Sequence, residues 1–269
     1  MGRLEGKVAV ITGATSGIGE ATARRFVTEG ARVVLAGRTV AKGEALAREL
    51  GAHALFQRAD VVHEAEIAAL VETAVARFGR LDCMFNNAGA AAAGPLDTIS
   101  EEQFAHATKL LLGSVVFGMK HAARVMKAQR SGSILNNSSV AALRAGQGDI
   151  LYSATKAAVT HVTRLAGVEL GPFGIRVNSI SPAAIATPIF WGGSARANTL
   201  SDEDNRRKQE KLEQSLAHAS PLPRSGFAAD VANAALFLAS DEGSFVSCHD
   251  LVVDGGRSSF FFEPPRGAA

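Results

Sequence analysis

The stretch VAVITGATSGIGE, residues 8–20, decides the fold of this chain. Residues 8–11 are apolar throughout, which is typical of a strand covered on both faces of a parallel sheet. A glycine-rich turn at residues 12–19 follows at once and opens a helical segment. Glycines let the backbone turn sharply and let a pyrophosphate approach the free N–H groups at a helix N-terminus. The stretch predicts a phosphate-binding turn between a strand and a helix, with an ordinary strand-to-helix turn as the alternative.

On either side of this turn, short β-branched runs alternate with longer segments rich in Ala, Leu, Glu and Arg. Repeated β-α-β units predict an α/β protein with a single-domain, doubly wound parallel sheet of about seven strands, spanning residues 1–269. We expect strands at 8–11, 32–36, 53–58, 81–85, 133–137, 175–180 and 251–253. We expect helices at 17–29, 41–50, 64–78, 101–129, 150–170 and 228–239.

The composition argues against several classes of function. Basic and acidic residues number 28 and 26, so a nucleic-acid or anionic-membrane partner is not expected. Cys83 and Cys248 form no CxxC pair and the seven histidines show no metal-ligand spacing, so no metal site is expected. The longest apolar runs are too short to span a bilayer, and the first residues do not form a signal peptide. We therefore expect a cytoplasmic protein.

The end of the second expected strand carries Gly37 and Arg38 instead of a carboxylate. A guanidinium pairs well with a 2′-phosphate, which favours NADP(H). NAD(H) is still compatible because nothing here repels it, and a solvated arginine is the alternative interpretation of Arg38. Asp60, at the end of the third strand, is placed either to meet the adenine amino group or to cap the following helix.

Tyr152 and Lys156 lie four residues apart in an expected helix, one turn apart on the same face. An ammonium beside a phenol favours the phenolate, so we predict a Tyr152 pKa below the usual value of about 10. Ser139 ends the preceding strand, where its hydroxyl can bond a substrate oxygen. Tyr152 is the only tyrosine, so any phenol chemistry depends on it, although an ordinary exposed Tyr/Lys pair would show the same spacing.

Five motifs occur together, in order, along nearly the whole chain. They are TGATSGIG at residues 12–19, NNAG at 86–89, NSS at 137–139, YSATK at 152–156 and RVNSISP at 176–182. In this combination the chain resembles the short-chain dehydrogenase/reductase family, which has a Rossmann fold. The run GMKHAARVM at 118–126 is most similar to the branch that holds secoisolariciresinol and xanthoxin dehydrogenases.

The resemblance implies an NAD(P)-dependent oxidoreductase that moves hydride between the cofactor and a secondary alcohol or ketone. Tyr152 would be the general acid/base, Ser139 would orient the substrate oxygen, and Lys156 would bind the nicotinamide ribose. The family also implies a homo-oligomer, a tetramer or a dimer. Together, the turn and the resemblance give a cofactor set of Gly13, Ser16, Gly17, Ile18, Gly19, Arg38, Asp60, Val61, Asn87, Ala88, Gly89, Tyr152, Lys156, Pro182, Ile185 and Thr187.

Two positions depart from the family pattern. Leu111 stands where the family usually has an asparagine that helps a proton relay through the lysine. Ala183 stands where the family usually has a glycine beside the nicotinamide. These departures motivate a second hypothesis, a cofactor-binding sensor or assembly protein with weak catalysis. The intact Ser139, Tyr152 and Lys156 favour the enzyme.

Two segments interrupt the alternation of strands and helices. Residues 188–222 fall where the family places a lid over an apolar or cyclic substrate. Within them, Phe190 and Trp191 either form an aromatic wall or pack under a surface helix. The charged run 202–211 is interpreted as a solvated helix face. The tail 258–269 holds three successive phenylalanines, which we expect to be buried at an interface between subunits.

Overall fold

The computed structural model describes residues 2–92 and 94–260. Its seven parallel strands form one sheet in the order β3-β2-β1-β4-β5-β6-β7, which confirms the predicted doubly wound α/β fold. The order reverses its direction at β1, between β2 and β4, and ligands bind outside the carboxyl ends of strands at such a point. The strands are β1 Val8–Thr12, β2 Arg32–Gly37, β3 Ala54–Arg58, β4 Cys83–Asn86, β5 Gly132–Asn137, β6 Ile175–Pro182 and β7 Asp250–Val253.

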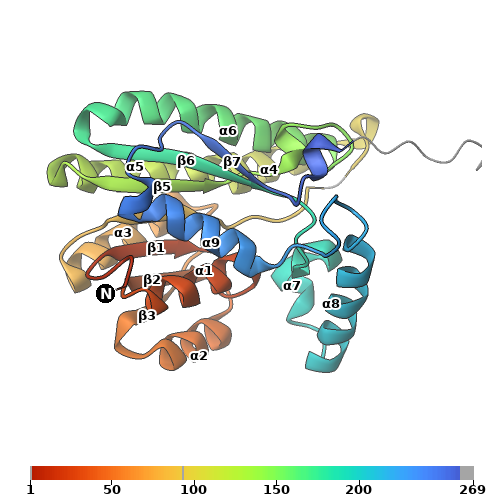
Figure 1. Cartoon of the computed structure of the whole chain (residues 1–269), viewed down its shortest axis with the longest axis horizontal. Helices are drawn as coiled ribbons and strands as arrows, with labels where there is room; N and C mark the ends of the chain where they lie inside the picture. The colour runs from red at the N-terminus through yellow and green to blue at the C-terminus, as the bar shows by residue number, and fades with distance from the viewer. Residues whose placement is uncertain (1, 93, 261–269) are drawn as a thin grey trace, which may run out of the picture.

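Helices cover both faces of the sheet (Figure 1). One face carries α1 (Gly17–Thr28), α2 (Val40–Leu50) and α9 (Ala228–Ala239), and the other carries α3 (Glu64–Phe78), α5 (Ser114–Gln129) and α6 (Ile150–Leu170). A central strand such as β1 therefore buries both sets of alternating side chains, which explains its uninterrupted apolar run, while the edge strands β3 and β7 are only partly buried. Of the helices in the part of the chain that the structure describes, none is long and apolar enough to cross a membrane.

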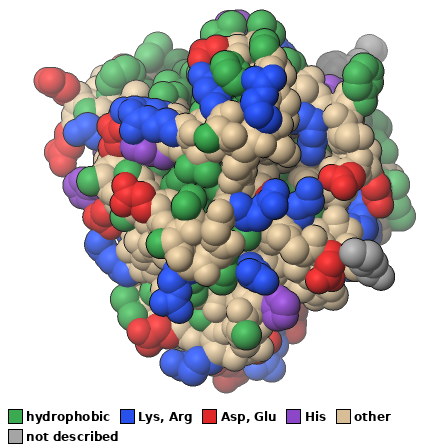
Figure 2. Space-filling view, turned by 90° about the vertical axis from the view of Figure 1, so that its left-hand side faces the viewer, with side chains coloured by type: hydrophobic (Ala, Val, Ile, Leu, Met, Phe, Trp, Pro, Cys, Tyr) green, Lys and Arg blue, Asp and Glu red, His purple; other side chains and the backbone are tan. Residues whose placement is uncertain are grey.

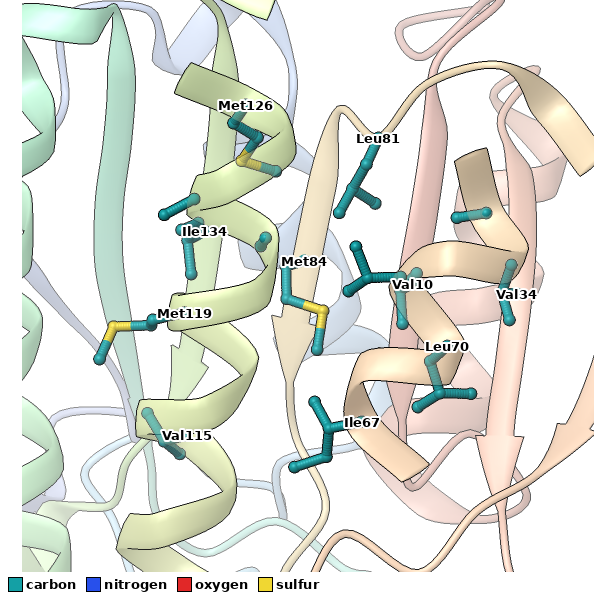
Figure 3. Close-up of a cluster of buried hydrophobic side chains, with 14 of the residues drawn as sticks. Val10, Val34, Ile67, Leu70, Leu81, Met84, Val115, Met119, Met126 and Ile134 are labelled. Atoms are coloured by element: carbon teal, nitrogen blue, oxygen red, sulfur yellow. The ribbon is translucent and has the colours of Figure 1, made fainter. Parts of the chain in front are cut away.

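The core is divided between the two faces. Val10 of β1 belongs to one buried cluster with Ile67 and Leu70 of α3 and Met119 of α5 (Figure 3). Ile11, the next residue along β1, points to the opposite face and joins the cluster under α1 and α9. Close packing in the two clusters fixes the positions of the strands relative to one another. Their carboxyl ends therefore form one rigid edge of the sheet.

The segment expected as one helix over residues 101–129 is in fact three pieces. The helix α4 (Glu101–Ala107) is followed by a π-helical turn, Thr108–Gly113, before α5 begins at Ser114. Ser114 Oγ donates a hydrogen bond to the carbonyl of Leu110 at 2.6 Å. Hydrophobic periodicity does not reveal one extra residue in a turn, which is why the prediction of a continuous helix was wrong.

The segment 188–222 folds into short helices beside the carboxyl edge of the sheet (Figure 1). They comprise a 3₁₀ turn at Pro188–Trp191, α7 (Gly193–Ala197) and α8 (Asp202–Leu216). The residues of α8 are all at least partly exposed, which confirms the solvated helix predicted from the charged run. On the opposite side of the molecule, lysines and arginines are spread among acidic and apolar side chains (Figure 2).

Candidate active site

A cleft of about 450 Å³ lies along the carboxyl edge of the sheet and under the lid segment. It joins the glycine-rich turn at one end to Tyr152 at the other. Two predicted residues, Gly17 and Gly19, do not line it. Both belong to the first turn of α1. The predicted residues that do line it are Gly13, Ser16, Ile18, Arg38, Asp60, Val61, Asn87, Ala88, Gly89, Ser139, Tyr152, Lys156, Pro182, Ile185 and Thr187.

Two glycines after β1, Gly13 and Gly19, stand where a side chain would collide with the backbone. Gly13 has φ +67°, and a Cβ there would lie 3.0 Å from the Cα of Ala88. A Cβ on Gly19 would lie 2.2 Å from the carbonyl oxygen of Gly13. The backbone therefore comes close to the cleft where α1 begins, and the free N–H groups of that helix favour an anion. This cradle fits the pyrophosphate of a dinucleotide.

The ends of three strands are tied together beside this turn. Thr12 Oγ1 accepts hydrogen bonds from the backbone N–H groups of Asn87 and Ala88, at 2.9 and 3.0 Å. Asn87 Nδ2 donates to the Thr12 carbonyl, and Asn137 Nδ2 donates to Asn87 Oδ1, both at 2.9 Å. Asn87 thus positions the cleft wall through its side chain. Thr12 was not predicted because a threonine that ends a strand carries no distinctive pattern.

At the adenosine end, Arg38 is 57% exposed and its Nη1 lies 4.0 Å from Asp60 Oδ2. Asp60 does not cap α3: the cap residue is His63, and Asp60 Oδ1 accepts a hydrogen bond from the backbone of Val62 at 3.3 Å. The helix-cap interpretation of Asp60 is therefore wrong, because two residues separate it from the cap position. Arg38 and Asp60 both face the cleft.

Gly37 shows why no acidic side chain stands at the end of β2. A Cβ on Gly37 would lie 2.7 Å from Thr15 Cγ2 and 2.9 Å from Thr15 Oγ1. A carboxylate at residue 37 would displace Thr15 from the cleft wall, since Cβ contacts this short do not occur in unstrained structures. The lid also reaches this end, because Asn198 Nδ2 donates to Thr39 Oγ1 at 2.9 Å.

At the other end, Tyr152 and Lys156 occupy the first two turns of α6, one above the other. Lys156 Nζ donates to the carbonyl of Asn137 at 2.6 Å and lies 5.6 Å from the centroid of the Tyr152 ring. Ser138 Oγ donates to the Lys156 carbonyl at 3.0 Å, which ties α6 to the end of β5. Ser139 begins the next turn and accepts a hydrogen bond from the backbone of Ala141 at 3.1 Å.

Burial dominates the acidity of both groups. It raises the pKa of the Tyr152 phenol, and a hydrogen bond with Ser139 acts in the opposite direction. Burial also lowers the pKa of Lys156 to about 8. The lowered phenol pKa predicted from the sequence is wrong for this structure, because burial of the phenol disfavours its charged form, and the Lys156 ammonium donates to Asn137 and not to the phenol. A protonated phenol at neutral pH is the form that can donate a proton.

Leu111 lies in the π-helical turn and is buried. Its Cδ2 lies 3.2 Å from where a Cβ of Gly89 would stand, and Lys156 Nζ lies 4.0 Å from the same point. Hydrocarbon therefore occupies the space beside the ammonium. Asn137 Oδ1 is buried in this neighbourhood without a hydrogen-bond partner among the described residues, which fits a site completed by a polar ligand.

Of the two lid aromatics, only Phe190 lines the cleft, and it is 54% exposed. The indole of Trp191 turns toward α8, where Nε1 donates to Asn205 Oδ1 at 3.3 Å. The prediction that these aromatics line the cleft is therefore confirmed for Phe190 and wrong for Trp191. Trp191 instead helps to pack α8 onto the lid. Adjacent residues of a 3₁₀ turn point in different directions, which explains the difference.

Known proteins are similar to this chain in sequence and in fold. A family profile described as enoyl-(acyl carrier protein) reductase matches residues 13–258. Momilactone A synthase from Oryza sativa subsp. japonica is 44% identical over 95% of this chain and 91% of its own length. Secoisolariciresinol dehydrogenase from Forsythia intermedia is 39% identical over 95% of this chain and 90% of its own length. The crystal structure of levodione reductase superposes with a TM-score of 0.83 at 33% identity, covering 96% of this chain and 100% of that chain.

This chain belongs to the short-chain dehydrogenase/reductase family. The resemblance inferred from the five motifs is thereby confirmed, including its proximity to secoisolariciresinol dehydrogenase. The protein is an NAD(P)-dependent oxidoreductase of the alcohol dehydrogenase and ketone reductase type. Its described residues contain no cluster of His, Cys, Asp and Glu that could hold a metal ion.

Proposed function

We propose that this enzyme interconverts a secondary alcohol and a ketone carried on a largely apolar, ring-shaped molecule, with Ser139, Tyr152 and Lys156 as the catalytic residues. The observation that carries the proposal is that these three side chains line one end of the cleft whose other end is the phosphate-binding turn. Apolar side chains at that end, among them Leu110, Phe190 and Leu216, suit a hydrocarbon body. Levodione reductase, as its name states, reduces levodione.

The residues divide the work of ketone reduction between them. The bound nicotinamide supplies the hydride. Ser139 donates a hydrogen bond to the carbonyl oxygen and holds it beside the phenol. Tyr152 transfers its proton to that oxygen as negative charge develops there. Lys156 and the Asn137 carbonyl fix the position of α6 at the end of β5. In alcohol oxidation, Tyr152 accepts the proton instead.

A turnover screen tests the proposal directly. The purified protein is incubated with NADPH or NADH and a panel of cyclic and linear ketones, and with NADP⁺ or NAD⁺ and the matching alcohols. Absorbance of the reduced nicotinamide reports the rate. We expect turnover of cyclic secondary alcohols and ketones. Tight cofactor binding without turnover of any compound would contradict the proposal and favour the sensor hypothesis.

We infer a preference for NADP(H) over NAD(H). The guanidinium of Arg38 is exposed in the cleft and close to Asp60, where a 2′-phosphate would compete for it. Thr15 occupies the space that a ribose-binding carboxylate at residue 37 would need.

Replacing Arg38 by alanine is expected to raise the KM for NADPH about tenfold, since a charge-assisted hydrogen bond contributes about 1.5–3 kcal/mol and this one is partly screened by solvent. The KM for NADH should change less than twofold. Steady-state kinetics with both cofactors check this. Arg48→Ala, an exposed arginine of α2 that does not line the cleft, is the matched control. Equal losses with both cofactors would refute a phosphate-binding role.

We also propose that the enzyme is a cytoplasmic homo-oligomer that associates through α5 and α6. Val116 of α5 and Leu165 and Val168 of α6 are large apolar side chains with exposed fractions of 37%, 58% and 72%. Such surfaces usually mark contacts between subunits. Both cysteines are free thiols, which suits a reducing compartment. Of the tail 258–269, predicted to be buried at an interface, residues 261–269 lie outside the described residues, and Phe260 is 47% exposed.

The double variant Leu165→Glu/Val168→Glu is expected to shift the molar mass of the protein from an oligomer toward a monomer, because each contact would place carboxylates in an apolar interface. Light scattering coupled to gel filtration measures this. Val40→Glu, an exposed valine on α2, is the control and should leave the mass unchanged. A wild-type protein that is already monomeric would overturn the inference.

A further inference from the structure

A basic side chain lies at the substrate end of the cleft. Arg257 begins a short 3₁₀ turn after β7 and lines the cleft together with Tyr152. Its Nε donates to Gln147 Oε1 at 2.6 Å, and its Nη1 donates to the carbonyl of Ala219, in the segment that follows α8. Within the described residues, Nη2 makes no hydrogen bond and the guanidinium forms no salt bridge with a carboxylate. Among the described residues, no acidic side chain forms a salt bridge with Arg257, although Asp254 lies near enough for the Arg257 charge to help lower the pKa of its carboxyl.

This charge lies close to the reacting phenol. Gln147, which holds Arg257, is followed by Gly148, and a Cβ on Gly148 would lie 2.9 Å from Tyr152 Cδ1. The loop that backs the tyrosine ring therefore also positions the guanidinium. Tyr152 and Arg257 line the same cleft, so a molecule bound there can meet both side chains.

The segment that bears Arg257 is held in place by its own hydrogen bonds. Arg144 Nη1 donates to the carbonyls of Ser258 and Phe260, both at 2.8 Å. The Asp254 carboxylate accepts from the backbone of Gly256 at 2.8 Å and of Ser258 at 2.6 Å. The hydrogen bonds of Asp254 therefore go to the backbone of the turn and not to the guanidinium. The guanidinium is preorganised, so little conformational entropy is lost when it binds a ligand.

We propose that Arg257 recognises a carboxylate on the substrate, so that the enzyme acts on cyclic ketones and alcohols that carry an anionic oxygen group remote from the reacting carbon. Arginine suits this role because its planar fork matches the two oxygens of a carboxylate. The apolar lining of Phe190 and Leu216 would hold the ring between the two polar ends. The inference rests on the proposed function, since it assumes that Tyr152 meets the reacting oxygen.

Two ketones of equal ring size test it: 4-methylcyclohexanone, which is neutral, and 4-oxocyclohexanecarboxylate. We expect the wild-type enzyme to show a kcat/KM at least tenfold higher for the carboxylate, as one charge-assisted hydrogen bond contributes tenfold or more. Arg257→Met should remove this preference, so that kcat/KM falls about tenfold more for the carboxylate than for the methyl compound. Arg257→Lys, which keeps the charge but loses the fork, should retain part of it. Arg207→Met, an exposed arginine of α8 outside the cleft, should retain all of it.

The outcomes distinguish the inference about Arg257 from the proposed function of the enzyme. Equal losses on both ketones in Arg257→Met would show that Arg257 only fastens the lid and the loop, and would overturn the inference while the proposed function stands. A wild-type enzyme that does not prefer the carboxylate also overturns it. If neither ketone is reduced, the proposed function is in question, and calorimetric binding of 4-oxocyclohexanecarboxylate to the wild-type and Arg257→Met proteins with NADPH decides the inference. Equal affinity, or no binding to the wild-type protein, then rejects it.

Discussion

Replacing Tyr152 by phenylalanine is expected to lower kcat/KM for ketone reduction by roughly 100- to 10,000-fold, the usual contribution of a positioned general acid. The substitution removes one hydroxyl and keeps the ring that packs against the loop at Gly148. Tyr152 is the only tyrosine, so no other phenol in the chain can replace it. Turnover of the best ketone from the screen, with reduced nicotinamide followed by absorbance, measures the loss.

Cofactor affinity and thermal unfolding serve as controls for this variant. Thermal unfolding should match the wild-type protein, and cofactor affinity should fall far less than kcat/KM, because the substitution removes only one of the polar groups of the predicted cofactor set. Ser139→Ala provides a graded comparison, as it removes a hydrogen bond to the substrate oxygen but leaves the acid in place. A Tyr152→Phe enzyme within tenfold of wild type would falsify the assignment of the phenol as proton donor.

Replacing Lys156 by methionine is expected to change both activity and the pH dependence of stability. Burial lowers the pKa of Lys156 from 10.5 to about 8, so the folded protein binds this proton less tightly than the unfolded chain does. Between pH 8 and 10.5 the unfolded state therefore carries more protons, and the wild-type free energy of unfolding gains a contribution as pH rises. At about 1.4 kcal/mol per pKa unit, that contribution reaches about 3 kcal/mol. Methionine has no proton to lose and removes it.

Urea unfolding of both proteins without cofactor, at several pH values from 7 to 10, checks this prediction. The difference in free energy of unfolding, variant minus wild type, should be largest below pH 8 and shrink as pH rises. Lys211→Met, a lysine on the exposed helix α8, should show no such trend. A difference that stays constant over this range would mean that the ammonium is not destabilised by burial. The variant should also lose most of its turnover, because the ammonium holds the end of β5 against α6.

Much of the site follows from local patterns along the chain. The glycines at residues 13 and 19 are required because side chains would collide with backbone, and that requirement is visible as a glycine-rich motif. Tyr152 and Lys156 share a helix face because of their four-residue spacing. The sheet order follows from repeated right-handed β-α-β units, which bring the carboxyl ends of all seven strands to one edge.

Other features depend on contacts that spacing does not reveal. The direction of the Tyr152 pKa shift was mispredicted because it depends on how deeply the phenol is buried, which the spacing of Tyr152 and Lys156 does not reveal. Thr12 joins Asn87 across 75 residues, and the lid residue Asn198 reaches Thr39 across 159. Trp191 turns away from the cleft because α8 offers it a partner.

Sequence alone determined the alternation of strands and helices, the phosphate-binding turn and the identity of the one phenol, because each of these is set by neighbours within a few residues. Only the tertiary structure decided the π-helical turn at residues 108–113, the acidity of Tyr152 and Lys156, and the position of Arg257 beside the loop that backs the phenol. These depend on which side chains the closed sheet brings together and on how much water it excludes. Gln147 and Arg257 lie 110 residues apart, and no local pattern encodes a contact over that distance.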